Sequence, residues 1–266
     1  MPRLLSLIAG LILTALPNGL HAQSAEEIAA QGGCPECSLE YAALRGLQLV
    51  KGDFRDADLS DADLKNGVLP GARFANADLR RAEMERSDVS DADFTDANLE
   101  AADLEKALAQ RALFVGAKMR DVDMENILAE EADLTGADLR DSKLRRARLP
   151  RAILVEADLR GADMERIDLG GADLREARLE RVDLDRADLT GAVLRGAALD
   201  GARLTSANLQ GADLRGADLA GTRLRRTNLS GADLRDADGL SQRQLDLACG
   251  DAKTRLPSGM TVPACG

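Results

Sequence analysis

A bulky apolar side chain recurs at every fifth residue from Leu39 to Leu234, and the phase of this series never slips. The series has 40 positions, of which 29 are Leu, and only Ala109 and Ala129 are small. A period of five fits neither an α-helix, with about 3.6 residues per turn, nor a strand, with a period of about 2. The many Gly, Asp and Asn residues between the centres also disfavour a helix. The chain is therefore expected to fold as a repeat of five-residue units.

Each unit usually reads Ala-(Asp/Asn)-Leu-X-X, as in Ala212-Asp213-Leu214-Arg215-Gly216. This pattern predicts a short extended segment in which Ala and Leu point inward and Asp points outward, followed by a turn at the last two residues. Four such sides would close a square coil of 20 residues. The four Phe residues support this length because they lie 20 residues apart, at positions 54, 74, 94 and 114. They would stack on one side of successive coils, about 4.8 Å apart.

The unbroken Ala-(Asp/Asn)-Leu units of residues 37–238 resemble the pentapeptide-repeat family. The resemblance implies an all-β fold, a right-handed quadrilateral β-helix with about 20 residues per coil. It carries no catalytic residues that could be transferred to this chain. Some cytosolic members of the family bind DNA gyrase by imitating the shape and charge of DNA.

Residues 1–22 have the pattern of a signal peptide. Arg3 supplies a positive charge, an apolar run covers Leu4–Leu16, and Leu20-His21-Ala22 suits cleavage. A membrane anchor is disfavoured because the run is shorter than the about 20 residues that a spanning helix needs. We therefore expect cleavage after Ala22, a periplasmic or secreted protein, and no membrane span in the mature chain.

Two segments flank the repeat, an N-terminal cap over residues 23–36 and a C-terminal cap over residues 239–266. Short helices are expected over Ser24–Gln31 and Ser241–Ala248, where they would cover the open ends of the solenoid.

The four cysteines lie near the two ends, Cys34 and Cys37 at one and Cys249 and Cys265 at the other, and favour structural disulfides in an exported chain. Cys-Pro-Glu-Cys at residues 34–37 also suits a redox motif or half a zinc site, but no thioredoxin-like βαβ unit accompanies it. Ten coils would separate the two pairs by about 48 Å, whereas a disulfide needs Cα atoms about 4.4–6.8 Å apart. The expected bonds are therefore Cys34–Cys37 and Cys249–Cys265.

Composition argues against several classes of function. The formal net charge is -11, whereas a nucleic-acid binder would be basic. The single histidine, His21, lies in the expected signal peptide, so catalytic triads and histidine metal sites lose their usual component. We expect no enzyme activity, no cofactor and no metal.

Two charged columns arise from the 20-residue period. The acidic column is Asp63, Glu83, Asp103 and Asp123. It could imitate nucleic acid or collect Ca²⁺, but hydrogen bonds to the backbone of the adjacent turns are the favoured alternative. The basic column is Arg175, Arg195, Arg215 and Arg235. It could bind carboxylates or phosphates, but pairing with Asp173, Asp213 and Asp233 is favoured.

A third surface feature breaks the repeat rule, because apolar residues occupy positions that should be outward and polar. They are Leu108, Leu113, Leu128 and Ile153, with Val115 and Val155 at turn positions. They could form one apolar strip around a corner and serve as an interface. Alternatively, Leu108 and Leu128 could rotate inward to fill the space beside Ala109 and Ala129.

The sequence thus predicts an exported, non-enzymatic scaffold that binds an unknown partner protein or a second copy of itself. The alternative is an acidic DNA mimic that binds a nucleic-acid enzyme such as DNA gyrase. The expected signal peptide argues against that alternative because gyrase is cytosolic.

Overall fold

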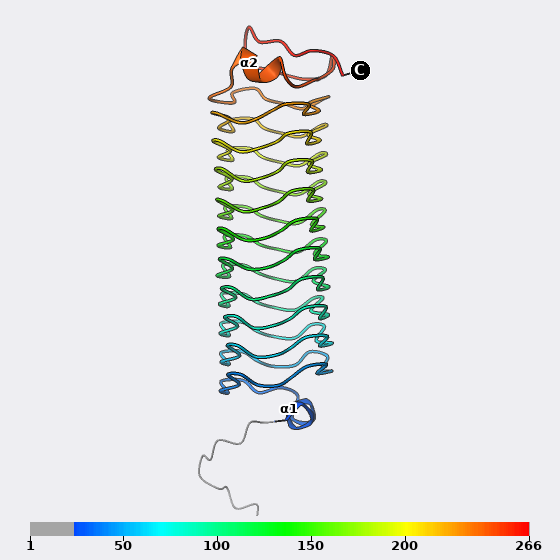
Figure 1. Cartoon of the computed structure of the whole chain (residues 1–266), viewed down its shortest axis with the longest axis vertical. Helices are drawn as coiled ribbons and strands as arrows, with labels where there is room; N and C mark the ends of the chain where they lie inside the picture. The colour runs from blue at the N-terminus through cyan, green and yellow to red at the C-terminus, as the bar shows by residue number, and fades with distance from the viewer. Residues whose placement is uncertain (1–23, 266) are drawn as a thin grey trace, which may run out of the picture.

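The computed structural model describes residues 24–265, which form a straight column of stacked coils (Figure 1). Parallel bridges join residues 20 apart in sequence, from Gly33 with Asp53 to Asp218 with Asp238. Each coil therefore takes 20 residues and lies directly on the next, as the period predicted. The expected signal peptide, residues 1–22, lies outside the described residues.

Each side of a coil is a short extended segment with one outward residue between two inward ones. Ala57 and Leu59 are at most 1% exposed, whereas Asp58 between them reaches the surface. The backbone N–H of Asp58 donates to the carbonyl of Cys37 (2.8 Å), and that of Leu59 donates to the carbonyl of Asp78 (2.7 Å). The middle of each side thus pairs with the coils on both sides of it, which satisfies its backbone polar groups.

The corners are tight turns that recur every five residues, four to a coil. At one of them the N–H of Ala62 donates to the carbonyl of Leu59 (3.1 Å), and Asp61 takes a φ of 56°. A type II turn requires this left-handed conformation at its third residue. Gly, Asn and Asp tolerate it best, which explains their frequency at this position of the unit.

The interior is filled by the centres of the five-residue units and by the alanines two positions before them. The four Phe rings are fully buried and stack in one column, with centroids 5.1, 4.8 and 4.9 Å apart and planes within 8° of parallel. Ala109 and Ala129, the two small residues among the unit centres, are also fully buried. The expected coil length and Phe stack are thus present.

Helix α1, Ala25–Gln31, closes the N-terminal end of the column (Figure 1). Its N-cap is a capping box: the Ser24 hydroxyl accepts from the N–H of Glu27 (3.2 Å), and the Glu27 carboxylate accepts from the N–H of Ser24 (2.9 Å). Ile28 is fully buried and packs into the hydrophobic core. The expected N-terminal helix therefore forms and covers the first coil.

Helix α2 at the other end is shorter than expected, because it spans only Gln242–Leu245 and not Ser241–Ala248. The chain after it returns to the solenoid, where Cys249 bridges to Asn228 and Arg255 bridges to Asp233. These residues replace a further coil on two sides of the column. Backbone pairing to the last coil therefore competes with continuation of the helix.

Side chains of the C-terminal cap satisfy carbonyls that the last coil would otherwise expose. The amide of Gln244 donates to the carbonyl of Leu219 (2.9 Å) and to that of Thr222 (3.1 Å). The hydroxyl of Thr254 donates to the carbonyl of Leu229 (2.9 Å). The cap thus removes free pairing edges from this end of the β-helix.

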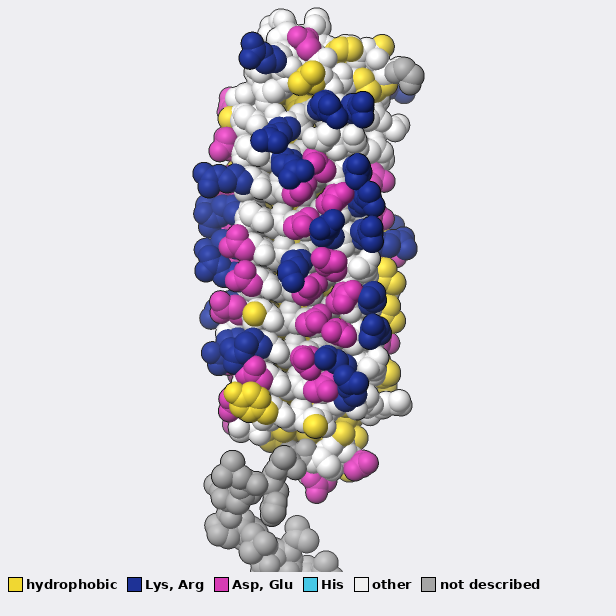
Figure 2. Space-filling model, viewed as in Figure 1, with side chains coloured by type: hydrophobic (Ala, Val, Ile, Leu, Met, Phe, Trp, Pro, Cys, Tyr) yellow, Lys and Arg dark blue, Asp and Glu magenta, His cyan; other side chains and the backbone are white. Residues whose placement is uncertain are grey.

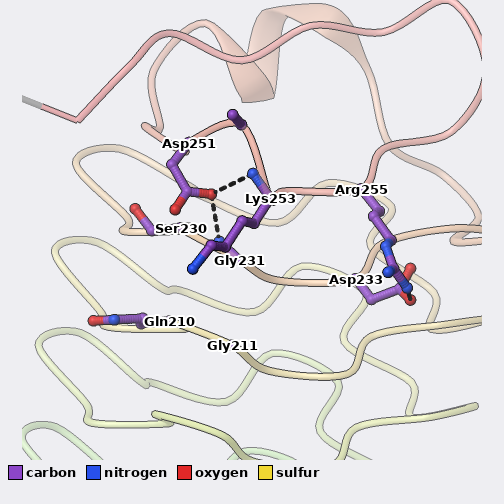
Figure 3. A pocket seen from close by; sticks show the side chains of 9 residues that line it. Gln210, Gly211, Ser230, Gly231, Asp233, Asp251, Lys253 and Arg255 are labelled. Atoms are coloured by element: carbon purple, nitrogen blue, oxygen red, sulfur yellow. Dashed lines mark hydrogen bonds and ion pairs between the residues drawn. The ribbon is translucent and has the colours of Figure 1, made fainter.

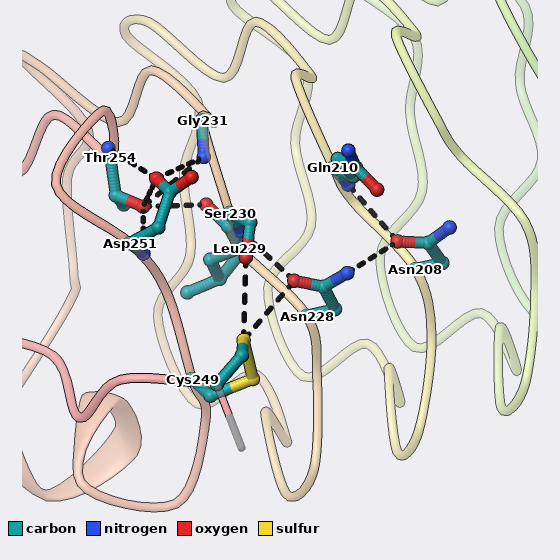
Figure 4. The surroundings of a disulfide bond; sticks show 10 residues. Asn208, Gln210, Asn228, Leu229, Ser230, Gly231, Cys249, Asp251 and Thr254 are labelled. Carbon is teal, nitrogen blue, oxygen red and sulfur yellow. Dashed lines mark hydrogen bonds between the residues drawn. A yellow bond between two sulfur atoms is a disulfide. The ribbon is translucent and has the colours of Figure 1, made fainter.

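Both expected disulfides are present, Cys34–Cys37 and Cys249–Cys265, with Cα atoms 5.5 and 4.7 Å apart. The first follows α1, and the second ties the end of the chain to the last coil (Figure 4). Ser230 of that coil donates to the sulfur of Cys265 (3.3 Å). Each disulfide therefore lies at one end of the solenoid.

Candidate functional surface

Outward side chains form columns along the solenoid, because each coil repeats the positions of the coil before it. Figure 2 shows one face, on which rows of Asp and Glu run beside rows of Lys and Arg. Hydrophobic side chains gather along one edge of this view. The surface therefore separates charged columns from a limited apolar region.

The acidic column lies on one side of four successive coils, where bridges join its members. Its aspartates, Asp63, Asp103 and Asp123, each accept a hydrogen bond from the backbone N–H two residues later, at 3.1, 2.8 and 3.0 Å. Glu83 forms an ion pair with Lys65 (3.0 Å). The expected hydrogen bonds to the backbone of the adjacent turns are thus present, and these aspartates stabilise their own turns.

Asp103 is the member of this column whose ionisation is most disturbed. Burial is the main cause of its raised pKa, and the hydrogen bond with Glu85 and the charges of Glu85 and Asp123 add to the increase. The hydrogen bond from the N–H of Glu105 acts in the opposite direction and lowers this pKa. The pair formed with Glu85 joins neighbouring columns, so the 20-residue period does not reveal it. Within residues 24–265, no group of three or more Asp, Glu, Cys or His residues is arranged to hold a metal ion.

Three arginines of the basic column pair with the aspartate two residues earlier, as expected. They are Arg175 with Asp173, Arg215 with Asp213 and Arg235 with Asp233, each with a shortest distance of 2.6 Å. These hydrogen bonds lower the pKa of all three aspartates. Arg195 differs because the residue two positions earlier is Val193. It is exposed and forms no ion pair with a residue of the described range, although its charge helps to lower the pKa of Asp213 in the next coil.

The apolar residues that break the repeat rule point outward. Leu113 and Ile153 are each 40% exposed, and Leu108 is 37% exposed. Leu128, Val115 and Val155 are partly exposed. The suggested inward rotation of Leu108 and Leu128 is therefore wrong. Their backbones pair directly with each other, and this pairing holds both residues in the outward register.

The apolar residues do not form the single strip around a corner that was expected. They occupy two adjoining sides, Leu108 and Leu128 on one and Leu113 and Ile153 on the next. The corner between these sides carries ion pairs of Arg111 with Asp91 (2.7 Å) and of Arg151 with Glu131 (3.1 Å). Two separate apolar patches result.

Aliphatic and acidic residues alternate from coil to coil on the side that carries Leu113. This alternating column consists of Asp93, Leu113, Asp133, Ile153, Asp173, Val193 and Asp213. Val193 is partly exposed and extends the apolar series beyond the residues predicted. Its spacing of 40 residues from Ile153, equal to that between Ile153 and Leu113, is the sequence signal that was missed.

The carboxylates of the alternating column fall into two groups. Asp173 and Asp213 pair with arginines, as described above. Asp93 and Asp133 instead accept a hydrogen bond from the N–H two residues later, at 3.0 Å in both cases. Neither forms an ion pair with a residue of the described range. Uncompensated negative charge therefore lies on the N-terminal half of the alternating column, and Arg195 of the basic column lies beside its C-terminal half.

A hollow beside the C-terminal cap is lined by residues of the last coils and of the cap, and both of its carboxylates have partners (Figure 3). The Asp251 carboxylate accepts from the N–H of Gly231 (2.8 Å) and from that of Lys253 (2.9 Å). These bonds, with others from the same turn, lower the pKa of Asp251. Arg255 lies 3.4 Å from Asp233. The two carboxylates of this hollow are thus engaged by neighbouring groups.

A family model described as pentapeptide repeats matches the chain with eight copies, over residues 37–67, 57–96, 92–127, 132–171, 167–205 and 202–238. The chain belongs to the pentapeptide-repeat family. This match confirms the resemblance drawn from the Ala-(Asp/Asn)-Leu units and supports a right-handed β-helix for the coils.

This pentapeptide-repeat protein is similar to several solved structures. HetL of Nostoc sp. strain PCC 7120, described as involved in heterocyst differentiation regulation, is 28% identical, with 87% of this chain and 98% of HetL covered and a TM-score of 0.38. Rfr23 of Cyanothece 51142 is 36% identical over 42% of this chain and 65% of its own, with a TM-score of 0.32. QnrB1, a plasmid-mediated fluoroquinolone resistance protein, is 21% identical over 64% and 88%, with a TM-score of 0.47.

No curated protein matches this pentapeptide-repeat sequence significantly. In the described part of the chain, neither α1 nor α2 has the length and apolar character needed to cross a bilayer.

Proposed function

We propose that this protein is an exported, non-enzymatic scaffold that binds a protein through an outer side of its β-helix. One observation carries the binding role: Leu113 and Ile153 are each 40% exposed at positions where the repeat usually places Asp or Asn. Outward side chains add nothing to the core, so the fold does not require these residues. Covering them is favourable by about 25 cal/mol per Å².

The absence of enzyme activity is supported by how the molecule is filled. Stacked Leu, Ala and Phe side chains occupy the interior of residues 37–238. Active sites usually lie in concave pockets with convergent polar groups, and both carboxylates of the hollow at the C-terminal cap are engaged by neighbouring groups of the chain.

Export is supported by the signal-peptide pattern of residues 1–22 and by two disulfides, which persist in oxidising compartments. Expression of the full chain in a bacterium, followed by fractionation and intact-mass measurement, tests this. A mature chain that begins at Gln23 in the periplasm or the medium is expected. A mass that includes Met1–Ala22 would contradict export.

The DNA-mimic alternative is less well supported by the charge pattern. Each strand of duplex DNA carries one negative charge per about 3.4 Å of the helix axis. The acidic column spaces its carboxylates by about 4.8 Å and is followed on the same side by Lys143, which pairs with Asp123 (3.0 Å). The negative stripe is therefore both sparse and short.

Photo-crosslinking tests the proposed binding side. A photoreactive amino acid is placed at position 113 and, in a control variant, at the exposed position Lys118 on the neighbouring side. We expect covalent products from position 113 in cells that make the protein, and none from position 118. The absence of any product from position 113 would refute binding through this side.

A further inference from the structure

We propose that the occupant of the alternating column is a second copy of this chain, packed antiparallel about a two-fold axis at Ile153. This inference rests on the proposed binding role of that side and names its partner. The axis would lie in the plane of the side and at right angles to the solenoid. Such a rotation gives an isologous interface, in which the same patch of both copies is used.

The apolar residues of the column have the symmetry that this arrangement requires. Leu113 and Val193 each lie 40 residues from Ile153, which is two coils or about 9.6 Å. Reversing the order of the coils about Ile153 places Leu113 opposite Val193 of the second copy. Ile153 faces its own equivalent at the axis. All three aliphatic positions are then covered by aliphatic side chains.

The unpaired charges of the column fall into complementary positions under the same rotation. Arg195 shares a coil with Val193, so it lies opposite the coil of Leu113 in the second copy. The coils on either side of that one carry Asp93 and Asp133, about 4.8 Å away along the axis. Arg195, which has no ion pair within the described part of its own chain, thus lies near Asp93 and Asp133 of the second copy, which have none either. An Arg–carboxylate pair shielded from water strengthens an interface and fixes its register.

A parallel dimer would not satisfy these charges. If the two solenoids ran in the same direction with coils in register, Asp93 would face Asp93 and Asp133 would face Asp133, and each Arg195 would stay in the coil of Val193, three coils from Asp133. Like charges in such contact oppose association. In the antiparallel arrangement Asp133 faces Asp173 and Asp93 faces Asp213, but Arg175 and Arg215 already pair with those two residues. The charge distribution therefore selects the antiparallel orientation.

The available area suits a reversible dimer. The coils from Arg73 to Asp233 overlap when Ile153 lies on the axis, which gives a length of about 38 Å at 4.8 Å per coil. A side of five residues is at most about 16 Å wide, so each copy would bury roughly 600 Å² of planar area. The total of about 1,200 Å² is at the lower end for specific interfaces. We expect a dissociation constant on the order of micromolar.

Cysteine crosslinking tests the orientation. The variant Ile153→Cys should give a covalent dimer with a short bismaleimide, because its two copies meet at the axis and packed sheets lie about 10 Å apart. Leu113→Cys alone and Val193→Cys alone should stay monomeric, since equivalent residues would lie about 19 Å apart. A mixture of these two variants should give a mixed dimer. Crosslinking of Leu113→Cys with itself, or of none of these variants, would overturn the proposal.

Equilibrium sedimentation tests the contacts without covalent bonds. Ile153→Asp and Arg195→Glu should each raise the dimer dissociation constant at least about tenfold. The matched control Arg223→Glu, exposed on another side, should change it less than about twofold. Added salt should also weaken the dimer.

The two proposals fail in different ways. A wild-type chain that stays monomeric at about 100 µM, far above the expected constant, refutes self-association. If photo-crosslinking at position 113 then captures a different protein, the binding side stands and only its partner was wrong. If that position captures nothing, both proposals fall.

Discussion

The Phe stack offers a direct test of how neighbouring coils stabilise one another. Phe74 has rings on both sides, at 5.1 and 4.8 Å, whereas Phe114 has one, at 4.9 Å, because the next centre is Leu134. All four Phe rings are fully buried. Replacing either Phe74 or Phe114 by Leu keeps an apolar side chain at the centre but removes a different number of ring contacts.

The expected difference follows from the ring geometry. An offset-stacked aromatic pair contributes about 0.5–1.5 kcal/mol beyond its buried area. Phe74→Leu removes two such contacts and Phe114→Leu removes one, so the first variant should be less stable by about 0.5–1.5 kcal/mol. Phe74→Ala adds a cavity and should cost about 3–5 kcal/mol. Lys118→Ala, at an exposed site, should change stability by less than about 0.5 kcal/mol.

Urea unfolding followed by far-ultraviolet circular dichroism measures these differences, because the chain has no Trp and a single Tyr. The free energy of unfolding is compared between variants that share the same dependence on urea. Equal free energies for Phe74→Leu and Phe114→Leu would refute the reasoning. The rings would then contribute through volume alone, and their alignment would add nothing.

Three further predictions concern the acidic column and the caps. Because the pKa of Asp103 is raised in the folded protein, stability should fall as pH rises through that pKa. Asp103→Asn should therefore raise the urea midpoint at pH 7, and this advantage should be lost below pH 3.8, the pKa of the carboxyl in the unfolded chain. Gly33→Ala should lower the thermal midpoint, because Gly33 has a φ of 124° and an added Cβ would lie 2.2 Å from the carbonyl oxygen of Asp53. Cys265→Ser opens a loop of 16 residues, which should cost the cap about 3 kcal/mol, and limited proteolysis should then cut the C-terminal tail first.

Features that repeat along the chain could be predicted from the sequence, because one local rule generates them. The buried centres, the 20-residue coil and the Phe stack all follow from the spacing of apolar residues. The turn hydrogen bonds of Asp63 and the pairing of Arg175 with Asp173 follow from residues two positions apart. The disulfides follow from the distance between the two ends.

Features that depend on contacts across coils or columns could not be read in this way. The pair of Asp103 and Glu85 joins residues on neighbouring columns, so neither period reveals it. The ion pair of Arg111 with Asp91 divides the expected apolar strip, and the sequence does not show which way such long side chains reach. Helix α2 ends early because Cys249 pairs with the last coil, a contact that helix propensity does not encode.

The difference between the five-residue core period and the 20-residue bridge period has a consequence for how such a protein can change. Loss of one unit, such as residues 136–140, would leave the series of buried centres unbroken. Every column beyond the deletion would nevertheless turn to the next side, so Ile153 would no longer lie above Leu113. Deletion or insertion of whole units can thus move outward residues from one side of the solenoid to another without changing the spacing of the buried centres. The Phe stack lies before this deletion and would keep its alignment. A deletion within the stack would instead place its Phe residues on different sides of the column.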